Sequence, residues 1–130
     1  MKFSITKNKK KRIKDNKNKG LEAEKLACDY LQAAGLQLLE PNFFSRCGEI
    51  DLIMQENDTL VFVEVRYRKN RNFGGAAASV TSAKQQRIIK TALYYQQQNR
   101  LQNTMRFDVI AIEGDNLAQI KWIKNAFFGG

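Results

Sequence analysis

Three acidic residues occur where the sequence around them is apolar. Asp51 interrupts the run GEIDLIMQ, Glu64 interrupts TLVFVEVRY, and Glu24 lies in a helix-like segment. An ionised carboxylate in an apolar setting costs several kcal/mol unless it has a partner. A hard divalent cation such as Mg²⁺ or Mn²⁺ prefers oxygen ligands and would offset the charge of all three acids at once. The sequence therefore predicts a metal site made by Glu24, Asp51 and Glu64.

Ordinary salt bridges are the alternative for the two strand acids. Asp51 and Glu64 could each pair with a nearby arginine, namely Arg46, Arg66 or Arg68. Both interpretations satisfy the rule that buried charges need partners. Spacing alone leaves them open.

Roles other than metal binding are also open to Glu24 and to two further acids, Glu49 and Asp108. Glu24 could reach water from the margin of its helix face. Glu49, two residues before Asp51, is expected to pair with Arg46 more than to act as an outer metal ligand. Asp108, in RFDVIAI, is interpreted as a strand-end or sheet-pairing acid rather than as a metal ligand.

The residue types in the chain exclude several other chemistries. There is no histidine, which removes the commonest general base and the usual Ser/His and Cys/His pairs. Cys28 and Cys47 lack CxxC spacing, so zinc, haem and disulfide scaffolds have no support, and both thiols are expected to be reduced and structural. Chemistry must come from carboxylates, Lys, Tyr or a bound metal.

A helix over residues 20–34 is expected to carry the first acid. The segment ends at Gly35, a residue favoured just beyond helix C-termini. At about 100° per residue, Glu24 falls inside the apolar arc, between Leu31 and Cys28, whereas Lys25 faces solvent. One acid of this helix therefore points inward.

Two strands are expected to carry the other acids. Residues 48–55 and 59–67 are predicted to form a hairpin. Period-2 alternation places Asp51 on the same face as Glu49 and Ile53, and Glu64 on the same face as its neighbours two residues apart, Phe62 and Arg66. Asp51 and the tripeptide 64–66 should therefore lie side by side on neighbouring strands.

The remaining elements complete an α/β fold. A short apolar run covers residues 36–39, and a loop over residues 68–79 leads to a helix that Thr81 or Ser82 caps and that ends near Gln98. Strands follow at 106–112 and 119–123. This order predicts a mixed β-sheet flanked by α-helices.

Net charge is unevenly distributed along the chain. The formal charge is +9, but residues 1–19 hold nine Lys/Arg and one Asp, so residues 20–130 carry only +1. The basic segment has too little apolar content to pack and is expected to be a disordered tail that either holds phosphates non-specifically or solubilises the protein. Residues 20–130 are expected to form a single domain.

Apolar segments of the kind that enter membranes are missing from the sequence. No run of about 18 apolar residues is present, and the N-terminus lacks the apolar segment of a signal peptide. The sequence therefore predicts a cytoplasmic protein with no membrane partner.

Several motifs in order resemble a known family. They are GLEAEKLA at 20–27, Asn42, RCGEIDLI at 46–53, FVEVRYR at 62–68, FG at 73–74, KQQR at 84–87 and RFDV at 106–109. Together they resemble the YraN-type family of uncharacterised bacterial proteins, which is similar to archaeal Holliday junction resolvases. An Asp followed about a dozen residues later by Glu-x-Lys resembles the wider PD-(D/E)xK nuclease superfamily.

The resemblance implies a restriction-endonuclease-like fold and a Mg²⁺- or Mn²⁺-dependent endonuclease that hydrolyses DNA, with branched DNA as one expected substrate. It implies that Glu24, Asp51 and Glu64 form the metal site, with the backbone carbonyl of Val65 as a further ligand. The position of the superfamily lysine is occupied by Arg66.

Arg66 is the main departure from the superfamily pattern. A guanidinium stays protonated, so Arg66 can stabilise negative charge or hold phosphate but cannot act as a base. A lysine could come from elsewhere, and Lys84 is one candidate. The more ordinary interpretation is that Lys84 binds a backbone phosphate or solvates its helix. Ala23 and Phe44 are smaller departures that do not involve the predicted metal.

Basic residues near the acids are predicted to bind nucleic acid. After the second strand come Arg68, Lys69 and Arg71, which with Arg66 make a basic patch. The other predicted nucleic-acid contacts are Arg46, Lys84 and Arg87. Such residues would attract a phosphate backbone, although a solvated basic loop that discourages edge pairing is the alternative.

Three functions are compatible with these features. The first is the metal-dependent nuclease. The second is a nucleic-acid-binding protein of the same fold without turnover, because the lysine is absent. The third is a scaffold whose basic tail binds RNA or acidic partners. A homodimer is expected if the DNA substrate has two-fold symmetry.

Overall fold

The computed structural model describes residues 2–69, 79–114, 117 and 119–127, with side chains from residue 18 onward. This part of the chain contains two helices and five strands. They are α1 (Lys2–Ala33), β1 (Gln37–Ser45), β2 (Gly48–Glu56), β3 (Thr59–Arg68), α2 (Ser82–Gln98), β4 (Met105–Glu113) and β5 (Gln119–Phe127).

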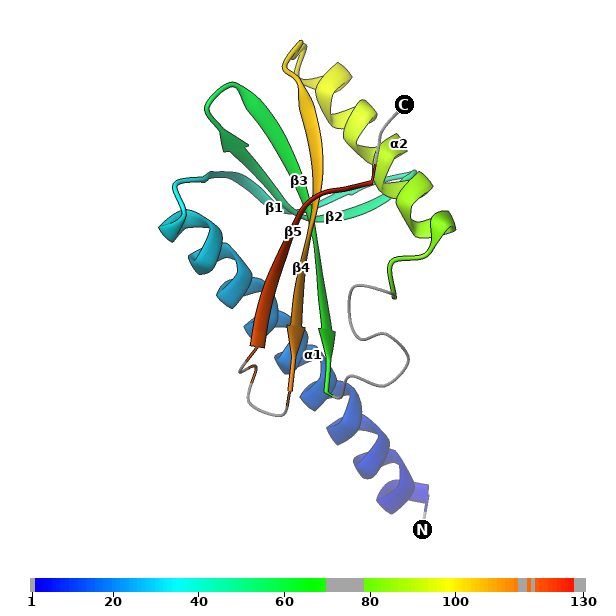
Figure 1. Cartoon of the computed structure of the whole chain (residues 1–130). Coiled ribbons are helices and arrows are strands. Elements are labelled where there is room, and N and C mark those ends of the chain that lie inside the picture. Colours follow the sequence, from blue (N-terminus) through cyan, green and yellow to red (C-terminus); the bar gives the residue numbers. More distant parts are fainter. Residues whose placement is uncertain (1, 70–78, 115–116, 118, 128–130) are drawn as a thin grey trace.

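The strands form one mixed sheet in the order β1-β2-β3-β4-β5 (Figure 1). Strands β1, β2 and β3 are antiparallel neighbours. Strand β4 is parallel to β3, because the chain returns through α2 between them, and β5 is antiparallel to β4. The expected α/β fold with a mixed sheet and flanking helices is confirmed, and it is consistent with a restriction-endonuclease-like arrangement.

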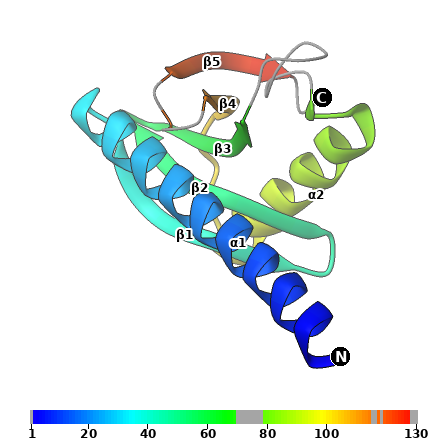
Figure 2. The same ribbon diagram turned by 90° about the horizontal axis from the view of Figure 1, so that it is seen from below.

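Each helix covers a different face of the sheet (Figure 2). Between α1 and the sheet lies a cluster of buried residues that includes Ala27 and Leu31 of the helix and Val63 of β3. Between α2 and the sheet lies a second cluster, which includes Tyr95 of the helix and Phe62 of β3. Because successive strand residues point to opposite faces, β3 contributes to both clusters in alternation.

Helix α1 begins much earlier than the sequence indicated. We expected a start at residue 20 after a disordered tail, whereas the helix runs from Lys2 and its N-terminal part extends past the sheet (Figure 1). Lys and Arg are good helix formers, so low apolar content does not by itself prevent a helix. The helix ends as expected before Gly35, whose φ is +102°. No helix in the described part of the chain has a stretch long and apolar enough to span a membrane.

Helix α2 agrees closely with the sequence prediction. The side chain of Thr81 caps it by accepting a hydrogen bond from the N–H of Lys84. Ile88, Ala92 and Tyr95 are buried, as expected. Ala83 was also expected to face inward but is exposed.

The strands are longer than the apolar runs that predicted them. Strand β1 was expected only over residues 36–39 but reaches Ser45 and includes Pro41, which an edge strand tolerates because one of its sides makes no ladder bonds. Strand β5 likewise extends to Phe127. Both outer strands carry many exposed residues, so hydrophobic patterning alone does not show their full length.

Asp108 is a structural residue, in agreement with its sequence interpretation. Its side chain is fully buried and accepts two hydrogen bonds from the guanidinium of Arg106, each 2.9 Å long. It also accepts from the indole of Trp122 and from the backbone N–H of Asn125. These bonds satisfy the carboxylate and tie β4 to β5.

Candidate functional site

The candidate site forms where β2 and β3 stop pairing. Their ladder runs from Glu56 opposite Thr59 to Leu52 opposite Val63 and ends there. Continuing this register would set Asp51 directly opposite Glu64, and like charges in that arrangement destabilise a sheet.

Asp51 takes over the hydrogen bonding at this point. Its Oδ2 accepts a 2.8 Å bond from the N–H of Val65. A side-chain carboxylate thus replaces the backbone acceptor that the ladder would have supplied. The prediction that Asp51 lies beside the tripeptide 64–66 is confirmed.

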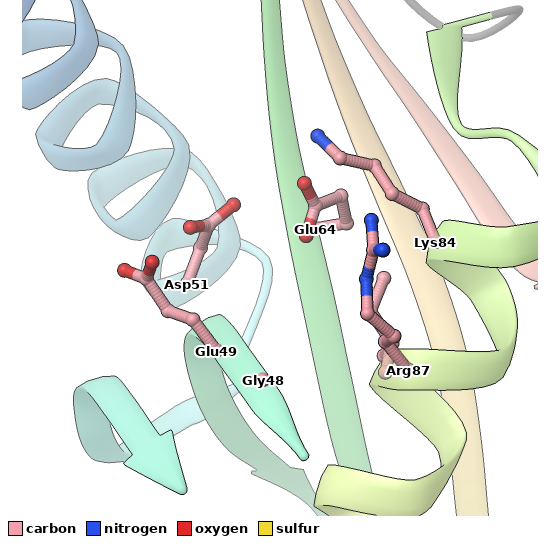
Figure 3. A pocket seen from close by; sticks show the side chains of 7 residues that line it. Gly48, Glu49, Asp51, Glu64, Lys84 and Arg87 are labelled. Carbon is pink, nitrogen blue, oxygen red and sulfur yellow. The ribbon is translucent and has the colours of Figure 1, made fainter. Parts of the chain in front are cut away.

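A cavity of about 190 Å³ opens beside these strand ends. Asp51 and Glu49 border it from β2, and Glu64 borders it from β3. Lys84 and Arg87 border it from α2, and Figure 3 shows their side chains directed toward Glu64. Acids therefore occupy one side of the cavity and cations the other.

Gly48 allows β2 to approach α2 closely enough to form this cavity. Its φ is +148°, a backbone conformation that favours glycine. A Cβ at this position would lie 3.3 Å from Oγ1 of Thr91 and 3.6 Å from Cβ of Arg87. This contact could not be predicted from the sequence, because Gly48 begins β2 and Thr91 and Arg87 belong to α2, far along the chain.

The acids of the cavity are held in a setting that disfavours their ionised forms. Burial raises the pKa of Asp51 to about 8, and the negative charge of Glu64 adds to the effect, while the hydrogen bond from Val65 opposes it. Burial likewise raises the pKa of Glu64, and the positive charges of Arg66 and Lys84 oppose that rise. An additional cation at these carboxylates would relieve the penalty.

Glu24 approaches the pair from the other face of the sheet. It is half-buried on α1, as its helical angle predicted. Burial raises its pKa, a hydrogen bond with the Asn42 side chain opposes that rise, and the charges of Glu49 and Glu64 reinforce it. Glu24 lines a separate cavity of about 300 Å³ with Cys28 and Asn42. It lies within electrostatic range of the pair but borders a different space.

The donor set fits a two-carboxylate cation site. Within the described residues, no three acidic or cysteine side chains come close enough together to hold a metal ion. Mg²⁺ is commonly held by one or two carboxylates, with water and substrate phosphate completing its shell. Asp51 and Glu64 supply two such carboxylates, and burial raises the pKa of both.

Arg66 makes the salt bridge that the sequence left open for Glu64. Its Nη1 lies 3.3 Å from Oε1 of Glu64, and its Nε donates a 2.8 Å bond to Oγ of Ser79. Arg66 does not border the cavity. Across the described part of the chain, no ion pair joins Asp51 to an arginine, so the salt-bridge alternative holds for one of the two acids.

The expected pairing of Glu49 with Arg46 is wrong. Arg46 is exposed in the turn between β1 and β2, and no ion pair joins it to Glu49 where the structure describes both. Glu49 instead belongs to β2 and borders the cavity with Asp51.

The other predicted basic contacts are placed as follows. Arg68 ends β3 and is exposed, as is Lys69 after it. Arg71 lies outside the described residues. Lys25 faces solvent as expected, 3.1 Å from Asp29 on the same helix turn.

The chain matches proteins of one family over most of its length. The model of "Uncharacterised protein family UPF0102" matches residues 23–112, a range that contains every acid of the candidate site. A UPF0102 protein of Nitrosomonas europaea is 53% identical over 110 residues, which cover 85% of this chain and 93% of that protein.

Two further relatives give the same picture. A UPF0102 protein of Vibrio parahaemolyticus is 51% identical over 113 residues, covering 85% of this chain and 93% of the relative. One from Legionella pneumophila is 52% identical over 114 residues, covering 86% and 96%.

Proposed function

We propose that this chain, which belongs to the UPF0102 family, is a Mg²⁺- or Mn²⁺-dependent nuclease that hydrolyses DNA phosphodiesters. The family model and the relatives confirm the family resemblance found in the sequence. One observation carries the proposal: Asp51 and Glu64 meet where two strands separate, and they face Lys84 and Arg87 across one cavity.

Asp51 and Glu64 would hold the cation, with the Val65 carbonyl as a further oxygen. Glu24 would add negative charge from the α1 side, since its charge already acts on Asp51. A bound divalent cation supplies positive charge at the phosphate and makes water more acidic.

The residues of the chain itself would bind and orient the substrate. Lys84 and Arg87 line the cavity and would grip the phosphate next to the acids. Arg66 would fix the direction of Glu64 through their 3.3 Å contact. Exposed Arg68 and Lys69 would hold phosphates further along the strand. We also expect the phosphate backbone of the DNA to be contacted by Arg46, in the β1–β2 turn, and by Arg71.

Hydrolysis adds one water across one P–O ester bond. The water oxygen joins phosphorus, that ester bond breaks, and the departing oxygen takes up a proton. Because Arg66 cannot accept a proton at neutral pH, it serves in orientation and charge balance rather than as a base.

A binding protein without turnover is the second candidate function. It is favoured by the state of Arg66, whose guanidinium bonds to Glu64 and Ser79 rather than facing the cavity. Both functions predict affinity for nucleic acid, and only the first predicts cleavage. DNA as the partner, a homodimer and a cytoplasmic location remain predictions.

A cleavage assay separates the two functions. The full chain is incubated with duplex, single-stranded and branched DNA and with RNA, in Mg²⁺, in Mn²⁺ and with a chelator. We expect cleavage of DNA with either metal and none with the chelator. Binding of DNA without cleavage of any substrate in either metal would support the second function and refute the first.

A further inference from the structure

The side-chain ammonium of Lys84 has no hydrogen-bond or ion-pair partner among the residues that the structure describes. It is half-buried and lines the acidic cavity, with its side chain directed toward Glu64 (Figure 3). Among the described residues, no ion pair or side-chain hydrogen bond involves its Nζ. Its charge nonetheless lowers the pKa of Glu64. The ammonium is therefore close to the acids yet available to a ligand.

Arg66 is in the opposite situation. Its Nε donates to Ser79 at 2.8 Å and its Nη1 lies 3.3 Å from Glu64. The planar guanidinium is thus fixed from two sides, and the residue does not line the cavity. It can hold Glu64 in place, but its position does not present a free cation to a substrate in the cavity.

The position of Lys84 in α2 is unfavourable for the helix itself. The N–H of Lys84 bonds to the capping Oγ1 of Thr81, so Lys84 stands where Glu or Gln would complete a capping box. The first turn of α2 contains no acid. A positive charge there opposes the helix dipole, whereas an acid would be stabilising. Local rules are commonly broken where a residue serves the function of a site.

We propose that Lys84 is a catalytic residue whose Nζ contacts a non-bridging oxygen of the scissile phosphate, while Arg66 is a positioning residue for Glu64. This inference rests on the proposed nuclease function. The ammonium of Lys84 would stabilise the negative charge that builds on the phosphoryl oxygens as water attacks and the ester bond breaks. Its contribution belongs to the transition state more than to binding.

The test compares Lys84→Gln with Lys84→Arg and with Lys90→Gln, which removes an exposed lysine of the same helix. For Lys84→Gln we expect kcat to fall about a hundredfold with KM changed less than about threefold. The thermal midpoint should stay within a few degrees, because Gln can complete the capping box. Lys84→Arg should recover part of kcat, and Lys90→Gln should behave as wild type.

Several results would overturn the inference. Wild-type kcat in Lys84→Gln would show that the ammonium does not act in the reaction. A raised KM with unchanged kcat would assign Lys84 to binding alone. A folded wild-type protein that binds DNA but never cuts it would refute the nuclease function itself, and with it this role for Lys84. An active wild type with an unaffected Lys84→Gln would refute only the role of Lys84.

Discussion

Asp51→Asn and Glu64→Gln are each expected to lower DNA cleavage at least about a hundredfold without unfolding the protein. Asn has the shape of Asp and keeps an oxygen that can accept the bond from Val65, which Asp51 now accepts at 2.8 Å. Only the charge that would hold a cation is lost. The measurement is the single-turnover cleavage rate in saturating Mg²⁺, with a thermal melt of each variant.

Matched controls come from exposed acids of α1. Asp29→Asn and Glu22→Gln make the same chemical changes away from the cavity, and both should cleave at the wild-type rate. Equal loss of activity in variants and controls would point to a general effect of net charge. Full activity in both Asp51→Asn and Glu64→Gln would contradict the assigned site.

Without a divalent cation, wild type is expected to lose stability through Asp51 as the pH rises toward 8, and Asp51→Asn is expected to remove that loss. Asp51 has a pKa raised to about 8, against an ordinary value of 3.8. Between these values the folded protein keeps a proton that the unfolded chain has released. Stability conferred by that proton is complete below about pH 4 and is lost as the pH rises toward 8.

The size of the effect is bounded by one proton. The free energy of unfolding can fall by at most about 1.4 kcal/mol per pH unit through a single group. Other carboxylates contribute with the opposite sign, so the informative quantity is the difference between Asp51→Asn and wild type. The variant should gain stability over wild type as the pH rises from about 5 to about 8 and should keep that gain at higher pH.

Urea unfolding of both proteins with a chelator present measures this difference. Asp29→Asn serves as the control, because Asp29 is exposed and its carboxylate lies in an exposed ion pair with Lys25. Curves for wild type and Asp51→Asn that stay parallel across this pH range would show that Asp51 ionises normally in the folded protein.

The sequence predicted the pairing of the central acids because it depends on local rules. Alternation along β2 and β3 and a short connection between them are enough to bring Asp51 beside Glu64. The 3.6-residue period of α1 correctly turned Glu24 inward. The mixed sheet was predicted from periodic segments, whereas the family resemblance came from specific motifs such as RCGEIDLI at 46–53 and FVEVRYR at 62–68.

What the sequence did not predict depends on contacts between distant segments. The β2–β3 ladder ends at Leu52, one position before Asp51 and Glu64 would stand opposite each other in the sheet. The bond from Arg66 to Ser79 joins residues that are 13 positions apart in the sequence. Gly48 lines the cavity, and a Cβ there would lie 3.3 Å from Oγ1 of Thr91, so this approach joins β2 to α2.

The helix termini show a different limit. We expected the basic segment to be disordered because it lacks apolar residues, yet α1 begins at Lys2. For the basic segment, the helix propensity of Lys and Arg favours a helix, whereas the lack of apolar residues for packing favours disorder. The cap at Thr81 was predictable because a single side chain decides it.

The central claim is that Asp51 and Glu64 together hold a divalent cation, and its most direct test is a thermal melt with and without millimolar Mg²⁺ or Mn²⁺ at about pH 8. Binding to the folded state alone raises stability by about 2.7 kcal/mol at a hundredfold excess over Kd. We expect the melting temperature of wild type and of Asp29→Asn to rise with the metal, and that of Asp51→Asn and Glu64→Gln to stay unchanged. The claim would be contradicted if neither metal raised the melting temperature of wild type, or if the melting temperature rose equally in all four proteins.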